Sequence, residues 1–306
     1  MSTRERWAQA FTATAEAYWT PERVSTRLGD KQLIMPPVQA APLLRALGLL
    51  RRDASMTSDT LRKYMQINHM VRLLRPFVLE LAETHGEVRL LDAGCGSSYL
   101  TLLLAWCFKH VWRKPAWIVG VDRNADLIAK CRRRAEQVDL EQMLRFEASS
   151  LQDLDLDALQ PAGSRRPFNA LVSLHACDTA TDDALALGVK LGVDLIAAAP
   201  CCQAELSRGW AALDLSTSPN ALGPLFKTPH LRREAAATVT DLMRALLLRG
   251  HGYQVTPMEF VPSEHTPKNT LLRAVRRGDG DPDALVQYAA LRHAVGGAGI
   301  KLETLL

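Results

Sequence analysis

The sequence has few cysteines, no long hydrophobic run and little excess charge, and each shortage excludes a class of protein. Its six cysteines in 306 residues lie in apolar or motif contexts. They do not form the dense framework of a disulfide-stabilised secreted domain, so reduced thiols in a cytosol are expected. The longest apolar runs are too short to span a bilayer, and the first residues lack the apolar core of a signal peptide. These features predict a cytoplasmic protein with no membrane partner.

The charge balance limits what can be said about partners. The formal net charge is +4 at pH 7 and the pI is about 8.8. Such mild basicity permits RNA as a partner without requiring it, and it is far from the footprint of a dedicated nucleic-acid-binding module. Arginines cluster at 132–134, 165–166, 232–233 and 276–277. They would suit a rim that contacts phosphates, although any one cluster is explained as well by a solvated helix face.

The chain divides by pattern into a helical part and an α/β part. Residues 1–86 carry apolar residues at helical spacing and predict a helical N-terminal accessory domain. Its expected helices are 6–18, 40–50 and 60–83, the last capped by Ser58 or Asp59. Residues 87–280 predict the main domain, and 281–306 predict one C-terminal helix with a frayed tail.

From residue 88 onward, short apolar runs alternate with helical stretches. The expected strands are 88–93, 117–122, 144–148, 170–174, 194–199, 253–261 and 269–275. Strands that are apolar on both faces and alternate with helices indicate a mostly parallel sheet covered on both sides. Only 262–268 joins the last two strands, and a parallel crossover needs about a dozen residues, so this pair is expected to be antiparallel. The predicted fold class is α/β, with a seven-stranded, mostly parallel sheet and an antiparallel last strand.

One long insertion, 202–229, does not fit the repeating pattern. It contains several prolines and glycines and follows a strand, so it is expected at the carboxyl end of the sheet, where ligands bind in open α/β folds. Long loops in compact domains are commonly functional. We therefore predict a lid here, with Trp210 as the best candidate among the tryptophans for stacking on a base.

A glycine-rich turn follows the first expected strand, at Asp92-Ala93-Gly94-Cys95-Gly96. Glycine permits positive φ and close approach of a ligand to the backbone, and free N–H groups at the start of the next helix attract the polar end of a nucleotide-like molecule. The next strand ends in Asp122, whose carboxylate can accept both ribose hydroxyls of an adenosine. A glycine-rich turn alone is a weak signal, and on these residues the site could belong to any nucleotide binder or to a degenerate Rossmann domain.

The turn resembles the first motif of class I methyltransferases, which use S-adenosylmethionine (SAM), more than a three-glycine dinucleotide fingerprint. Position 99 is Tyr, where a dinucleotide site would need a small residue. The resemblance implies a Rossmann-like methyltransferase sheet and SAM as cofactor. It also implies that Asp92 orders the loop and holds the methionine end, that Asp122 binds the ribose, and that Ser150 and Leu151 face the adenine. The full set of expected cofactor contacts is Lys63, Gln66, Asp92, Ala93, Gly94, Cys95, Gly96, Asp122, Arg123, Ser149, Ser150, Leu151 and His175.

Polar clusters follow the fourth and fifth strands and lie in the final hairpin. They read LHACDT (174–179), APCCQ (199–203) and EHTPKNT (264–270), and such residues after apolar strands suit the rim of a site. From about Thr60 to Arg276, the chain resembles a branch that includes the methyltransferase domain of eukaryotic glutathione S-transferase C-terminal domain-containing protein and bacterial proteins, some acting on ribosomal RNA. In that branch a lysine and a glutamine match Lys63 and Gln66. The candidate catalytic residues are His175, Cys177, Asp178, Cys201, Cys202, His265, Lys268 and Asn269.

Three mechanisms fit these clusters. The favoured one is direct attack of a base nitrogen or other amine on SAM, with positioning by the protein and a base such as His175 or Asp178. In the second, a cysteine such as Cys201 attacks carbon six of a pyrimidine, which needs a lowered thiol pKa or a neighbouring base. In the third, His175 and the cysteines bind zinc, but adjacent thiolates suit a tetrahedral ion poorly, and no metal is expected.

The sequence thus predicts a methyltransferase that acts on a base in ribosomal or transfer RNA. A methyltransferase for a small molecule or protein is the first alternative, and a non-catalytic SAM-binding protein is the second. For Cys95, Cys107 and Cys131 the better interpretation is a small buried hydrophobe, which is what free cysteine usually is.

Overall fold

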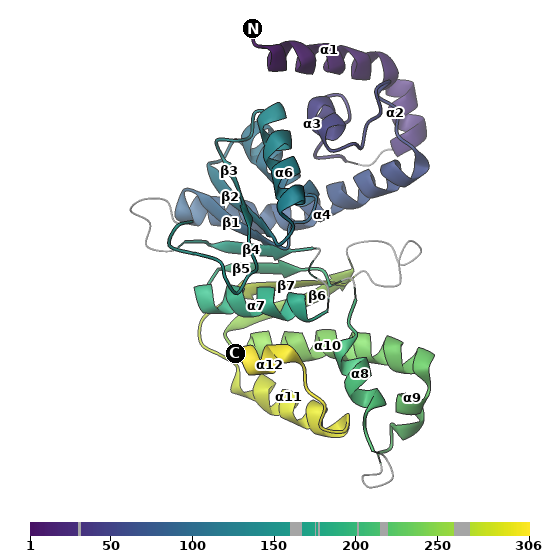
Figure 1. Ribbon diagram of the computed structural model, residues 1–306, viewed down its shortest axis with the longest axis vertical. Helices are drawn as coiled ribbons and strands as arrows, with labels where there is room; N and C mark the ends of the chain where they lie inside the picture. The colour runs from purple at the N-terminus through teal and green to yellow at the C-terminus, as the bar shows by residue number, and fades with distance from the viewer. Residues whose placement is uncertain are drawn as a thin grey trace. The chain divides into compact units, whose positions relative to one another are not determined.

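The computed structural model describes residues 1–29, 32–159, 167–174, 176, 178–200, 202–214, 220–259 and 270–306. Its strands form a seven-stranded sheet in the order β3-β2-β1-β4-β5-β7-β6 (Figure 1). The strands are β1 (Val88–Ala93), β2 (Ala116–Asp122), β3 (Leu144–Ala148), β4 (Ala170–Ser173), β5 (Leu195–Ala198), β6 (Tyr253–Glu259) and β7 (Thr270–Arg276).

The strand pairings confirm the predicted fold class. β1 pairs with β2, β2 with β3 and β4 with β5, all in parallel. β7 runs antiparallel to both β5 and β6. The short connection between the last two strands therefore gave the correct direction, because it is too short for a parallel crossover.

The chain forms two compact units, residues 1–149 and 150–306. The first holds β1 to β3, the glycine-rich turn and the N-terminal helices. Its helices are α1 (Thr3–Tyr18), α2 (Pro21–Leu28), α3 (Ala41–Ala46), α4 (Ser58–His85), α5 (Tyr99–Trp106), the π-helix η1 (Cys107–Trp112) and α6 (Ala125–Gln137).

Two helix starts differ from the prediction. No helix was expected between residues 18 and 40, but Pro21 occupies the first turn of α2, and Thr20 caps that helix. Proline suits this position because its missing N–H would have no partner there. The N-cap of α4 is Thr57, whose side chain accepts from the Thr60 N–H at 3.1 Å, so Ser58 already lies inside the helix.

The second unit is built around one long helix. Its helices are α7 (Thr179–Leu191), α8 (Glu205–Ala211), α9 (Gly223–Lys227), α10 (Pro229–Gly250), α11 (Pro282–Ala294) and α12 (Lys301–Leu305). Helix α10 contacts β6, α8, α9, α11 and α12. The tail, expected to fray, instead ends in α12, which also contacts α7. Within the described ranges, no helix combines the length and apolar character needed to cross a bilayer.

The insertion after β5 is folded onto this unit over much of its described length. Both α8 and α9 pack against α10. Trp210 of α8 is only 2% exposed, and its ring lies 4.7 Å from that of Phe226, centroid to centroid. The expectation that Trp210 stacks on a base is therefore wrong: burial against α9 gives a large aromatic ring more apolar contact than an exposed position would.

Candidate functional site

The glycine-rich turn is shaped by bonds to the neighbouring strand. The N–H groups of Gly94 and Cys95 both donate to the Val121 carbonyl, each at 2.9 Å. Gly94 and Gly96 have φ values of +74° and +53°, which glycine adopts without the strain that a Cβ atom would bring. The turn therefore has the backbone form that the sequence pattern predicts, and α5 begins directly after it.

Asp122, at the end of β2, reaches across to the turn. Its Oδ2 accepts from the Gly96 N–H at 3.0 Å, and its Oδ1 accepts from the Asn124 N–H at 2.8 Å. The residue expected to bind the ribose thus also holds the last glycine of the loop, a role that the resemblance assigned to Asp92. Two carboxylate oxygens offer about four acceptor positions, so ribose hydroxyls can bind in addition.

Asp92 lies beneath the turn and is 3% exposed. Burial, together with the nearby charge of Asp122, raises the pKa of the Asp92 carboxyl to about 7, although a hydrogen bond from the Thr101 hydroxyl opposes the shift. Thr101, on α5, is a partner that the sequence did not reveal. Because the carboxyl titrates near neutral pH, its charge depends on what binds beside it.

Two arginines predicted as phosphate contacts hold the protein's own backbone. Arg134 donates to the Ser97 carbonyl in the glycine-rich turn at 3.0 Å, and Arg132 donates to the Phe146 carbonyl in β3. Arg133, between them, is exposed. Arg132 is exposed as well, so the interpretation as a solvated helix face holds for two of the three arginines, although Arg132 and Arg134 also bind carbonyls.

The cysteines of the first unit are structural. Cys95, Cys107 and Cys131 are buried, and burial raises the pKa of each thiol above its usual value, which confirms their interpretation as small hydrophobes. Cys95 also limits its neighbour in β2: a Cβ atom at Gly120 would lie 2.8 Å from the Phe146 ring and 3.1 Å from the Cys95 sulfur.

The remaining expected cofactor contacts in the first unit lie on α4 or beside Asp122. Lys63 of α4 places its Nζ 3.6 Å from the centroid of the Tyr99 ring, at the first residue of α5. Gln66 is half-buried one turn further along α4, and Arg123 is exposed. The Ser149 N–H donates to the Asp122 carbonyl at 3.1 Å.

The second unit contains the expected adenine contacts and the catalytic candidates. Ser150 and Leu151 are half-buried, and the Ser150 hydroxyl bonds to Asp153 at 2.6 Å. Among the catalytic candidates, the structure describes Asp178 and Cys202. The others, His175, Cys177, Cys201, His265, Lys268 and Asn269, lie outside the described residues.

Asp178 joins the loop after β4 to the loop after β5. Its N–H donates to the Cys202 carbonyl at 3.0 Å. Its carboxylate accepts from the N–H groups of Ala204 and Glu205 at 2.8 and 3.0 Å, and from Arg208 at 2.9 Å. Burial acts to raise the pKa of Asp178, but these hydrogen bonds outweigh it and the pKa is lowered. The carboxylate is thus ionised and bound to the start of α8.

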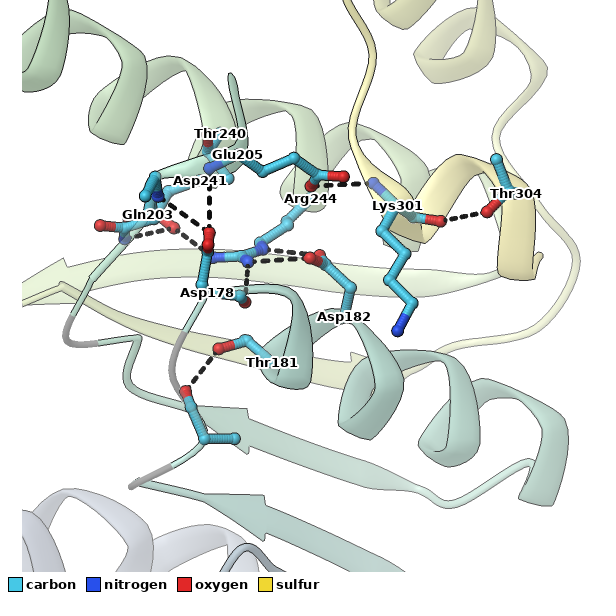
Figure 2. A network of polar contacts seen from close by, with 12 residues as sticks. Asp178, Thr181, Asp182, Gln203, Glu205, Thr240, Asp241, Arg244, Lys301 and Thr304 are labelled. Carbon is cyan, nitrogen blue, oxygen red and sulfur yellow. Dashed lines mark hydrogen bonds and ion pairs between the residues drawn. The ribbon is translucent and has the colours of Figure 1, made fainter. Parts of the chain in front are cut away.

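A buried ionic cluster supports this junction (Figure 2). The Arg244 side chain is 1% exposed and that of Asp182 is 0% exposed, and they form two hydrogen bonds of 2.8 and 3.1 Å. Arg244 also donates to Asp241 at 3.2 Å and to the Asp178 carbonyl at 2.9 Å. Our sequence reasoning missed this cluster. The available signal was a lone arginine within the apolar run LMRALLL of α10.

Metal binding is not supported in the described part of the chain, where no group of three or more His, Cys, Asp or Glu side chains could hold an ion. The zinc hypothesis concerned His175, Cys177, Cys201 and Cys202. Since only Cys202 of these is described, that hypothesis stays a prediction.

The comparison with protein families identifies the class. Residues 62–209, just under half of the chain, match the family model described as a methyltransferase domain. The matched stretch contains the glycine-rich turn, Asp122 and strands β1 to β5. The chain therefore contains a SAM-dependent methyltransferase domain of class I, and SAM is its cofactor.

Comparison with individual proteins gives distant likeness. No curated protein sequence matches the chain. Among solved structures, the chain is similar to the S-adenosylhomocysteine (SAH)-bound methyltransferase PaMTH1 of Podospora anserina, with 13% identity, 84% of this chain and 95% of that chain covered, and a TM-score of 0.45. The chain is also similar to the O-methyltransferase TomG of Streptomyces achromogenes, with 15% identity, 91% of this chain and 100% of that chain covered, and a TM-score of 0.45. An O-methyltransferase of Bacillus cereus has 14% identity, with 88% of this chain and 100% of that chain covered, and a TM-score of 0.42.

The raised pKa of Asp92 predicts a pH dependence of SAM binding. SAM carries a sulfonium and an ammonium group, which an ionised Asp92 attracts and a protonated one does not. Between pH 6 and pH 8, a carboxyl with a pKa near 7 goes from about one-tenth to about nine-tenths ionised, so we expect affinity to rise about tenfold. Calorimetric titration at several pH values measures this. Asp92→Asn should bind SAM weakly at every pH, and a wild-type affinity that is flat or falls over this range would contradict the prediction.

Proposed function

We propose that the protein transfers the methyl group of SAM directly to a nucleobase in ribosomal or transfer RNA. The observation that carries the direct mechanism is the junction at Asp178. It ties the loop after β4 to the loop after β5, and its carboxylate is ionised and occupied by Ala204, Glu205 and Arg208. The junction fixes the loops after β4 and β5 relative to each other, and fixed loops can position a substrate, which is the main contribution that direct transfer needs from the protein.

In direct transfer, a lone pair on the acceptor nitrogen attacks the methyl carbon of SAM. The new carbon–nitrogen bond forms as the carbon–sulfur bond breaks, SAH leaves, and the acceptor loses one proton to water or to a basic side chain. We assign Asp178 to positioning, because the hydrogen bonds from Ala204, Glu205 and Arg208 stabilise its ionised form and lower its pKa, which makes it a weak base. His175 is our candidate for a base.

Two features support RNA as the acceptor. The clusters LHACDT and APCCQ resemble the methyltransferase branch in which some bacterial members act on ribosomal RNA. Exposed arginines, namely Arg133, Arg233, Arg276 and Arg277, can contact phosphates, which supply much of the affinity for nucleic acid. We further propose the N-terminal helices of residues 1–86 as an accessory region that docks a folded RNA.

The proposal assigns a role to each part of the cofactor. Asp92 holds the methionine end, Asp122 accepts the ribose hydroxyls, and Ser150 and Leu151 face the adenine. Lys63, with its ammonium group over the Tyr99 ring at the start of α5, is assigned to the edge of the methionine pocket. These roles are supported by the order in which the motifs follow the strands.

Transfer of tritium from labelled SAM tests the function. The purified protein is incubated with total RNA, protein and small-molecule fractions from a strain that lacks the gene. We expect label in RNA, and mass spectrometry of nucleosides should find one methylated base that the deletion strain lacks. Asp122→Ala is the inactive control. Label confined to protein or small molecules would overturn the RNA proposal, and label in none of the fractions would favour a non-catalytic SAM-binding protein.

A further inference from the structure

Gln203, in the loop between β5 and α8, is a buried amide with only one half engaged. Gln203 is 6% exposed. Its Nε2 donates to both carboxylate oxygens of Asp241, at 3.0 and 2.9 Å. Its Oε1 is buried, and no residue in the described part of the chain donates to it.

The orientation of this amide is set by charge. A carboxylate can only accept hydrogen bonds, so the NH₂ group of Gln203 must face Asp241 and the oxygen must face away. Asp241 is in turn held by Arg244, which is paired with Asp182. Figure 2 shows Gln203 at one end of this network and Lys301 at the other. The oxygen is therefore held in one direction by groups from α7 and α10.

A buried acceptor without a donor is costly. Leaving it unsatisfied carries a desolvation penalty that a partner would remove, and native proteins keep few such groups. This one lies just beyond β5, at the edge of the sheet where ligands bind in open α/β folds. Its neighbour Cys202 accepts from Asp178, so the adjoining loop is positioned by the same junction.

We infer that Oε1 of Gln203 accepts a hydrogen bond from an N–H group of the nucleobase that is methylated, and that Asp241 is the positioning residue that keeps this oxygen turned toward the substrate. The inference rests on the proposed function. It makes Gln203 a specificity residue that selects a base edge carrying a donor. A base edge with only acceptors would leave two oxygens facing each other.

Two nearly isosteric variants separate this role from a structural one. Gln203→Met removes the acceptor oxygen. Asp241→Asn keeps an oxygen for Arg244 but presents an NH₂ group to Gln203, which turns the amide so that its own NH₂ faces the substrate. Gln287→Met, on the exposed face of α11, is the matched control. Transfer from labelled SAM to total RNA of the deletion strain, SAM affinity by calorimetry and the melting temperature are measured for each variant.

Both variants should raise the apparent KM for RNA about 10- to 100-fold, which is the range for losing one hydrogen bond to a buried group. Their affinity for SAM should be unchanged, and Gln287→Met should behave as wild type. A wild-type KM in both variants would overturn the inference. So would a parallel loss of melting temperature and SAM affinity, which indicates a structural role.

The same labelling experiment distinguishes a failure of the proposed function from a failure of this inference. If the wild-type protein labels a protein or small-molecule fraction instead of RNA, the RNA proposal falls. The same two variants are then compared on the fraction that takes the label. A raised KM for that fraction would support Oε1 of Gln203 as a contact for the acceptor molecule, and an unchanged KM would overturn this role.

Discussion

Replacing Asp122 by alanine is expected to weaken SAM binding about 100-fold or more. The change removes a carboxylate that holds the glycine-rich turn and that we propose to bind the ribose. It would no longer accept the ribose hydroxyls, and it would release the Gly96 N–H that it now binds at 3.0 Å. Hydrogen bonds to a charged group contribute about 1.5–3 kcal/mol each, so losing two of them corresponds to at least about 3 kcal/mol, or a factor above 100 in affinity. Calorimetric titration with SAM measures the effect.

Two further variants make this result specific. Asp126→Ala removes an exposed carboxylate in the first turn of α6, four residues along the chain, and should leave SAM affinity within about twofold. Asp122→Asn retains one oxygen for the Gly96 N–H and should bind with intermediate affinity. If Asp122→Ala bound SAM as tightly as the wild type, both the ribose role and the loop-holding role of Asp122 would be refuted.

Replacing Arg244 by methionine is expected to lower the free energy of unfolding by about 3–5 kcal/mol. The substitution keeps much of the side-chain length but leaves Asp182 and Asp241 without their shared cation. Removing one partner of a buried ion pair is strongly destabilising, because the remaining charge is left in a medium that solvates it poorly. Urea unfolding at pH 7, followed by circular dichroism, measures the loss.

A more exposed arginine on the same helix provides the control for Arg244→Met. Arg249, also on α10, forms a 2.7 Å pair with Asp281 in which both side chains are 39% exposed, and Arg249→Met should cost less than about 1 kcal/mol. Burial already raises the pKa of Asp182, against the effect of Arg244. The loss in Arg244→Met should therefore shrink as the pH falls, because protonation removes the uncompensated charge. Equal losses for the two arginines would contradict the assignment of Arg244 as a buried anchor.

The features predicted well from sequence are those that depend on short segments. The glycine turn after β1, the acidic end of β2 and the antiparallel direction of β7 follow from residue type and spacing over a few residues. The start of α2 and the cap of α4 were missed, although their signals are local: Thr20 before Pro21 is a cap followed by a first-turn proline, and Thr57 precedes the residues we had chosen. A proline that follows a capping residue marks the beginning of a helix.

The features that could not be predicted depend on residues far apart in the chain. Trp210 was placed at a site because it lies in an insertion, and only its contact with Phe226 shows that it is buried. The sequence predicted that Arg132 and Arg134 contact phosphates or lie on a solvated helix face. Only the positions of Ser97 and Phe146 show that they bind carbonyls. Sequence gives the charge of a side chain but not what lies within its reach.

By itself, the sequence determined the class of this protein: a mostly parallel α/β sheet with an antiparallel last strand, and a glycine-rich turn at Asp92–Gly96 that resembles the SAM-binding motif. These depend on backbone geometry, which short motifs encode directly. Only the tertiary structure decided how the motifs are held together. Asp122 reaches Gly96, Asp178 joins two loops, and Arg244 binds Asp182 across 62 positions of the chain. Hydrogen bonds over such separations are made by packing, because residues distant in sequence meet only once the helices and strands have assembled.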